Sequence, residues 1–132
     1  PKLQAIRDLI DDGKLGTVLE LRGRGKEDKR GGGEDLWVLG SHVMNLIHHF
    51  GGEPQWCFAR VEEEGQPVRK EHVKPGNEGI GPLAGDTVSA MYGLAGGAKA
   101  YFGTKRDMLG NRFGLQIYGP SAACTKDARR WR

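Results

Sequence analysis

The chain has 132 residues, a formal net charge of +3 and 37% hydrophobic residues. This length is that of one domain and this composition is that of a globular protein, so neither a two-domain protein nor a disordered chain is expected. The 22 glycines make up about 17% of the chain against a usual 7%, but they have no three-residue period, which excludes collagen and predicts many tight turns. No apolar run approaches the roughly 18 residues of a membrane span.

The chain begins at Pro1 inside the first predicted helix, residues 2–12, and we therefore expect it to be a piece of a longer protein. The apolar residues of this helix follow helical spacing: Leu3, Ile6, Leu9 and Ile10. Gly13 suits the left-handed conformation that ends a helix. A strand is predicted over residues 17–24, with three uncharged and three charged side chains on opposite faces: Thr17, Leu19 and Leu21 against Glu20, Arg22 and Arg24.

A polar loop follows over residues 23–35 and ends in three consecutive glycines. Five basic residues lie in it or just before it: Arg22, Arg24, Lys26, Lys29 and Arg30. The loop has neither the spacing of a P-loop nor a G-x-G-x-x-G that opens a helix after a strand. Two interpretations stay open: an anion site before a helix N-terminus, or a solvated loop in which Glu27 and Asp28 balance part of the charge.

The second predicted helix covers residues 35–50 and is ended by Gly51 and Gly52. Its buried stripe is formed by six residues: Leu36, Leu39, Val43, Leu46, Ile47 and Phe50. Glu34 and Asp35 at its start carry negative charges that interact favourably with the positive end of the helix dipole, and Asp35 is the expected N-cap.

Strands are predicted over four further segments: residues 55–63, 86–94, 98–105 and 113–118. Residues 95–97 form the turn of a hairpin, residues 64–86 form a long loop, and residues 119–132 show no clear element. Helices come early and strands run together later, which predicts an α+β fold with a mainly antiparallel open sheet and helices on one face. A doubly wound dinucleotide-binding domain is not predicted.

A polar flank lies beside the buried stripe of the second helix and contains His42, Asn45 and His49. Histidines as a class titrate near neutral pH, so His42 is a candidate proton donor or acceptor. The alternative is a half-exposed flank with incidental histidines. No metal site is predicted, because His42 and His49 lie about 10 Å apart along the axis and an ion needs both within about 2.1 Å.

The two cysteines, Cys57 and Cys124, do not form a disulfide framework and indicate reduced thiols in a cytoplasmic type of protein. Nucleic-acid binding is not predicted, since the basic loop has no aromatic residue before Trp37 and the tail offers one tryptophan among cations.

The run GGGEDLWVLGSHVMNLIHHFGG, residues 31–52, resembles the glucose–fructose oxidoreductase / inositol dehydrogenase (Gfo/Idh/MocA) family. Three further segments look similar in order and spacing: residues 10–16, 86–103 and 115–123. The resemblance implies the family's C-terminal α+β domain, with a dihydrodipicolinate-reductase-like fold and a large open sheet. It also implies oxidation or reduction of a sugar, inositol or related polyol with NAD or NADP.

In the family's D-x-G-x-H-x-x-D pattern the histidine is catalytic or positions substrate, and that role maps onto His42. Val38 and Asn45 stand where the pattern has its two acids, which departs from the usual family enzyme. The expected substrate-binding residues are Arg24, Lys26, Arg30, Asn45 and His49.

The family's dinucleotide-binding domain has no counterpart within these residues, so we expect residues 1–132 to form one truncated substrate or oligomerisation domain that is inactive alone. The full-length protein would use NAD or NADP, no metal, and would assemble with itself through the open sheet. The alternative is a non-catalytic assembly module derived from the same family.

Overall fold

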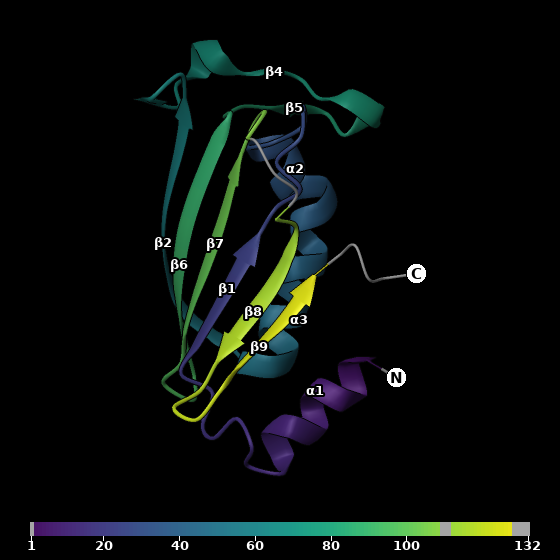
Figure 1. The fold of residues 1–132 in the computed structure, drawn as a ribbon. Helices are drawn as coiled ribbons and strands as arrows, with labels where there is room; N and C mark the ends of the chain where they lie inside the picture. The colour runs from purple at the N-terminus through teal and green to yellow at the C-terminus, as the bar shows by residue number, and fades with distance from the viewer. Residues whose placement is uncertain (1, 109–111, 128–132) are drawn as a thin grey trace.

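A seven-stranded sheet forms the body of the protein, and helices pack on one of its faces (Figure 1). The computed structural model describes residues 2–108 and 112–127. In chain order the elements are α1 (Lys2–Asp11), β1 (Glu20–Arg24), α2 (Gly33–Asp35), the π-helical turn η1 (Leu36–Gly40), α3 (Ser41–Gly51), β2 (Pro54–Glu63), β3 (Gln66–Pro67), η2 (Lys70–His72), β4 (Lys74–Pro75), η3 (Asn77–Gly79), β5 (Pro82–Leu83), β6 (Thr87–Leu94), β7 (Lys99–Lys105), β8 (Gly114–Tyr118) and β9 (Ala123–Asp127).

The strands of the sheet run in the order β3-β2-β6-β7-β1-β8-β9. Strand β1 is parallel to β7 and antiparallel to β8, so the start of the chain supplies an inner strand. All other neighbours in this sheet are antiparallel. The prediction of an α+β fold with a mainly antiparallel open sheet is therefore confirmed.

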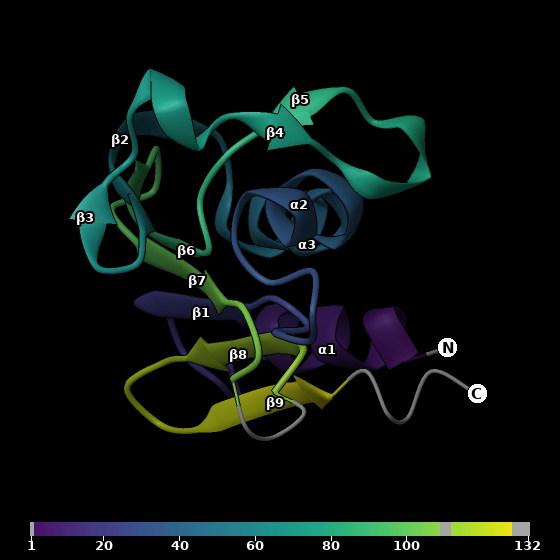
Figure 2. The same ribbon diagram turned by 90° about the horizontal axis from the view of Figure 1, so that it is seen from above.

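The core lies between the sheet and the layer formed by α1 and α3 (Figure 2). Its buried residues include Leu21 at 0% exposure and four residues of α3: Val43, Leu46, Ile47 and Phe50. A side chain at Gly23 of β1 would place its Cβ 2.4 Å from Val43 Cγ1, so glycine here allows α3 to lie against the sheet. None of the described helices is long and apolar enough to cross a membrane.

No helix of the described residues lies on the opposite face of the sheet, called the open face below (Figure 2). Strand alternation directs every second residue of β1 toward it, because the intervening Leu21 and Gly23 face α3. One row of paired residues crosses five strands of this face: Phe58, Met91, Tyr101, Arg22 and Gln116. Phe58 is 73% exposed.

Two predictions about strands are wrong. Strand β1 begins at Glu20 instead of residue 17, and Leu19, which was placed on the same face as Leu21, is 53% exposed whereas Leu21 is buried. Leu19 keeps backbone bonds to both neighbouring strands but lies just before the strand proper. The tail, expected to lack an element, contains β9, whose pairing with β8 the local sequence does not reveal. The tail tryptophan, Trp131, lies outside the described residues.

The loop between β2 and β6 runs across the outside of the helix layer instead of leaving the domain (Figure 2). It contains the short strands β3, β4 and β5 and two 3₁₀ turns. Strand β3 continues the large sheet beside β2, whereas β4 and β5 pair only with each other. The predicted hairpin between β6 and β7 is confirmed, with Gly97 at φ +91° in its turn.

Candidate functional site

The three consecutive glycines, residues 31–33, allow the start of α2 to pack closely against the end of β7 and the segment before β6. A Cβ on Gly31 would lie 2.3 Å from the backbone of Lys105 and Arg106. Gly32 has a φ of +90°, and a Cβ on Gly33 would lie 2.3 Å from the carbonyl oxygen of Ala84. These contacts leave no room for side chains, so close packing accounts for the glycines.

Asp35 is held inside this helix start by a buried hydrogen-bond network. The Thr104 hydroxyl and the Glu27 backbone N–H both donate to Asp35 Oδ2, the latter at 3.2 Å. The Gly32 N–H in turn donates to Thr104 Oγ1 at 3.2 Å. The expectation that Asp35 caps the helix is wrong, since the helix begins at Gly33 and Asp35 already has helical dihedral angles. Asp35 instead ties the helix to β7.

Glu27 anchors the basic loop from the inside, and its side chain is completely buried. Its carboxylate accepts hydrogen bonds from the Arg24 guanidinium, from the Lys105 N–H at 3.1 Å and from Arg112 Nη2 at 3.1 Å. The interpretation of Glu27 as part of a solvated loop is therefore wrong. The loop is fixed to the ends of β1 and β7.

The predicted substrate cations are each paired with an acid. Lys26 Nζ lies 3.3 Å from Asp28 Oδ2, and Arg30 bridges Asp28 at 3.2 Å and Glu78 at 3.3 Å. Burial alone would raise the pKa of Asp28, but hydrogen bonds from Arg30 and Lys26 outweigh it and lower the pKa to about 2. Asp28 is thus a permanent anion that orients both cations.

Arg24 lies on a different surface from the other predicted ligands. Its guanidinium lies over Gly103 of β7, on the open face, where a glycine Cβ would be 2.4 Å from Arg24 Nη1. Helix α3 lies on the other side of the sheet. The structure therefore brings Lys26 and Arg30 together in the loop before the helix but does not bring Arg24 to the face that carries His42.

His42, Asn45 and His49 are exposed along one flank of α3. This flank faces α1, because the Arg7 guanidinium donates to the His49 carbonyl oxygen and lies 5.4 Å from the centre of the Phe50 ring. Helical geometry from Ser41 onward places the three side chains on the same side. Their open position suits contact with a molecule outside this chain.

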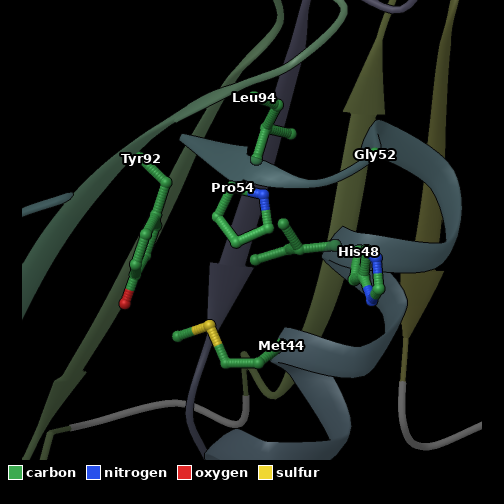
Figure 3. Close-up of a pocket in the computed structure, with 7 residues that line it drawn as sticks. Met44, His48, Gly52, Pro54, Tyr92 and Leu94 are labelled. Atoms are coloured by element: carbon green, nitrogen blue, oxygen red, sulfur yellow. The ribbon is translucent and has the colours of Figure 1, made fainter. Parts of the chain in front are cut away.

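His48 points to the opposite flank of α3, where Figure 3 shows an apolar hollow of about 80 Å³. Its walls come from α3, β2 and β6 and the turn between α3 and β2: Met44, Ile47, His48, Gly52, Pro54, Tyr92 and Leu94. His48 Nε2 lies 2.9 Å from Glu53 Oε1. Burial, with a smaller effect of the neighbouring Cys57 thiol, raises the pKa of Tyr92 to about 12. This hollow is separate from the His42 flank.

Sequence reasoning missed a second hollow, of about 180 Å³, on the outside of the helix layer. It is lined by Gly33, Trp37, Ile80, Pro82 and Leu83. The Trp37 side chain is 68% exposed. The sequence signal for this hollow was that Trp37 lies outside the buried stripe of the helix. The other wall comes from the loop between β2 and β6, and it forms only when the chain is folded.

The amino-acid sequence of this chain matches a known domain family. Residues 3–124 match the family of the GFO/IDH/MocA C-terminal domain. The chain belongs to this GFO/IDH/MocA domain family. The predicted resemblance is thereby confirmed, and no curated protein sequence matches the chain.

Solved structures of oxidoreductases share the fold of this GFO/IDH/MocA domain. A levoglucosan dehydrogenase in complex with NADH and L-sorbose has a TM-score of 0.68 and 19% identity over 93% of this chain and 37% of that one. An oxidoreductase domain protein from Kribbella flavida has a TM-score of 0.68 and 21% identity, over 97% and 39% of the two chains. An NAD binding oxidoreductase from Klebsiella pneumoniae has a TM-score of 0.67 and 16% identity, over 97% of this chain and 38% of that one. The chain thus spans less than two fifths of these proteins.

Neither of the two hollows described on the helix side of the GFO/IDH/MocA domain is large enough for a dinucleotide. The hollows on its helix side measure about 80 and 180 Å³, below the usual 300–1,000 Å³ of small-molecule sites. A shallow depression of about 360 Å³ lies on the open face, away from His42. Within the described residues, no group of three His, Cys, Asp or Glu side chains is arranged to hold a metal ion.

Proposed function

We propose that this chain is the substrate-side domain of an NAD-dependent dehydrogenase that acts on a sugar or related polyol. The observation that carries the proposal is the exposed flank of α3 with His42, Asn45 and His49, in a chain of the GFO/IDH/MocA domain family. Levoglucosan dehydrogenase, a structural neighbour, is described as a complex with NADH and a sugar. Residues outside this chain would bind the dinucleotide.

His42 would hold the proton of the substrate hydroxyl that is oxidised. It is the one ionisable side chain that this chain offers within the family pattern, because Val38 has no polar atom and Asn45 does not ionise. The amide of Asn45 and the imidazole of His49 would bind neighbouring hydroxyls from the same flank. The carboxamide of Asn45 can both donate and accept a hydrogen bond, so it can bind a hydroxyl group that acts as acceptor or as donor.

The helix that carries these residues is anchored at its start and along its inner face. Its first turn is tied to β7 by Asp35 and Thr104, and its inner face is buried by Val43, Ile47 and Phe50. Side chains on such a supported element keep a defined geometry toward a bound substrate. Lys26 and Arg30, oriented by Asp28, would contact substrate hydroxyls from the loop; the role of Arg24 stays a prediction.

The test is an assay of the full-length protein that contains this chain. The purified protein is incubated with NAD⁺ and, separately, with levoglucosan, L-sorbose, glucose and myo-inositol, and dinucleotide reduction is followed by absorbance. The proposal expects reduction with at least one of these sugars or polyols. Full-length protein that binds NAD⁺ but reduces it with none of them would contradict the proposal.

A second candidate function, assembly through the open face, is favoured by a specific observation. Phe58 and Trp56 on β2 remain exposed by 73% and 40%, and a shallow depression beside Phe58 is also lined by Met91 and Tyr101. Exposed aromatic residues beside such depressions are typical of protein interfaces. None of the described helices or strands covers this surface (Figure 2).

Phe58→Glu is expected to weaken self-association, because a carboxylate would be desolvated at the centre of such an interface. Sedimentation velocity of the full-length protein at several concentrations measures the effect. Trp37→Ala, on the other side of the sheet, is the matched control and should leave the oligomeric state unchanged. A protein that stays monomeric at all concentrations would refute the assembly role.

A further inference from the structure

Strand β2 forms the border of the large sheet along most of its length (Figure 1). Its inner side pairs with β6 from Pro54 to Glu62, whereas on its outer side β3 pairs only with Glu62 and Glu63. The first seven residues of β2, positions 54–60, are all exposed, and we call their outer side the β2 border. An exposed strand border of this length is a template for pairing with another strand.

The backbone groups of Cys57 and Ala59 point outward from the β2 border. The Val61 carbonyl oxygen accepts a hydrogen bond from the N–H of Val68, which follows β3, so Val61 faces the outer side. Backbone groups of successive residues alternate between the two sides of a strand, and β2 pairs with β6 without a shift over residues 56–62. The N–H and C=O groups of Ala59 and Cys57 therefore face outward as well. Within the described residues, no strand pairs with them there.

The β2 border lacks the features that usually keep such a strand from pairing. Charged side chains, prolines and bulges are the common ones. Between Trp56 and Val61 the sequence has one charged residue, Arg60, and no proline, and the irregularity in the pairing with β6 comes before Trp56. The side chains of Cys57 and Ala59 are small, so they leave room for a neighbouring strand.

A second copy of the same strand complements the β2 border when the two run antiparallel about Phe58. Cys57 of each copy then lies opposite Ala59 of the other, and the two pairs exchange four backbone hydrogen bonds. Phe58 lies opposite Phe58 of the second copy, on the open face, where its side chain is 73% exposed. Trp56 lies opposite Arg60 of the second copy, which is an aromatic–cation pair, and no like charges oppose each other.

Other antiparallel registers fit less well. If the strands were centred on Ala59, Trp56 of the second copy would have to pair with Glu62, a position that β3 already occupies. If they were centred on Cys57, Arg60 would lie opposite Pro54 and the aromatic–cation pair would be lost. The register centred on Phe58 keeps this pair and avoids β3.

We propose that two copies of this chain join edge to edge through the β2 border, antiparallel and centred on Phe58, so that their two sheets form one continuous sheet. The surface involved is the border of the sheet, and the open face need not be covered. The inference goes beyond the dehydrogenase function and does not rest on it. Because the tests below measure association alone, either proposal can fail while the other holds.

Sedimentation velocity of the full-length protein tests the association. Ala59→Pro removes an outward N–H and keeps the pairing with β6, because proline is tolerated on an edge strand whose N–H faces solvent. We expect it to halve the mass of the assembly that the native protein forms, with folding verified by circular dichroism. Tyr101→Glu, on the open face, is the control and should leave a dimer. A native protein that is monomeric, an assembly that survives Ala59→Pro, or dissociation by Tyr101→Glu alone would overturn the inference.

Disulfide cross-linking tests the register, and peptide mass spectrometry identifies the bond. Ala59→Cys should cross-link to the native Cys57 of the second copy, because opposite Cα atoms of a hydrogen-bonded pair lie about 5.5 Å apart. Cys57→Ser added to Ala59→Cys is the matched control and should abolish the cross-link, since equivalent residues of the two copies would lie about 8 Å apart, beyond disulfide reach. A cross-link that persists in this control, one between the native Cys57 residues, or none in Ala59→Cys would contradict the proposed pairing.

Discussion

At the scale of single residues, Glu27 is an acid whose side chain is completely buried. Its buried carboxylate joins the Arg24 and Arg112 guanidinium groups and the backbone of β7. Removing one member of a buried charged network leaves its partners uncompensated. Glu27 thereby fixes the loop that leads into the His42 helix.

Glu27→Gln should lower the free energy of unfolding by about 2–4 kcal/mol, less than for a fully buried pair because both arginines are partly exposed. Asp28→Asn, in the same loop but partly exposed, is the control and should cost less, about 1–2 kcal/mol, because solvent screens part of its interaction with Arg30 and Lys26. Urea unfolding followed by circular dichroism measures both. Equal losses for the two variants would refute the anchoring role of Glu27.

Tyr92 should make stability fall as the pH rises from 10 to about 12. In this window the unfolded chain loses the phenolic proton while the folded chain keeps it, so unfolding releases a proton and becomes easier with rising pH. Below pH 10 both states are neutral and Tyr92 has no effect. Tyr92→Phe should flatten the decline measured by urea unfolding across this range; an unchanged decline would contradict the raised pKa.

The residue types of the site could be predicted from the sequence, but their partners could not. The spacing of His42, Asn45 and His49 predicts one flank, and the structure has them on one flank. The burial of Glu27 and Asp35 depends on Lys105 and Thr104, which lie about 70 to 80 positions later in the chain. Local patterns contain no information on such distant hydrogen bonds.

At the scale of elements, the π turn η1 is the feature that helical periodicity conceals. The apolar pattern predicts one α-helix over residues 35–50, and the structure has α2, η1 and α3 in that stretch. One additional residue in a turn shifts the pattern only slightly, so the buried stripe is still recognised. Leu36 and Leu39 in the turn are only partly buried, whereas the stripe residues of α3 are buried.

Deletion of Val38 should be tolerated, because a π turn that loses one residue becomes an α turn with both ends in place. We expect a loss of roughly 1 kcal/mol, within the range of ordinary substitutions. Deletion of Met44 from α3 is the control, since it rotates Leu46, Ile47 and Phe50 by about 100° away from the core and should prevent folding. Thermal unfolding distinguishes the two, and similar losses would show that η1 does not absorb the deletion.

Strand prediction located most of the strands but missed β9, and it gave no pairing between distant segments. The β6–β7 hairpin is visible from two apolar runs joined by a glycine turn. The parallel pairing of β1 with β7 joins segments nearly 80 positions apart, and β9 is recognisable only by its pairing with β8. Register between distant strands depends on the assembled core.

At the scale of the whole molecule, the sheet separates the two surfaces to which we assign functions. The helix side carries His42 and the hollow beside Trp37, and the open face carries Phe58, Tyr101 and Arg24. The order of elements along the chain predicts this architecture, because early helices and late strands favour one helix layer on one sheet. The position of the β2–β6 loop over the helix was not predictable, since it is fixed by contacts such as Asn77 with Glu34.

His42 has the central role that we propose, which is to handle a proton in sugar oxidation by the full-length protein. The direct test compares kcat/KM for the preferred sugar in His42→Ala and in His48→Ala, a histidine on the opposite flank of the same helix. We predict that His42→Ala lowers kcat/KM by about 10²–10⁴-fold, the usual contribution of a general acid or base, while His48→Ala stays close to the unaltered protein. An unchanged kcat/KM in His42→Ala, or equal losses in both variants, would contradict this role of His42.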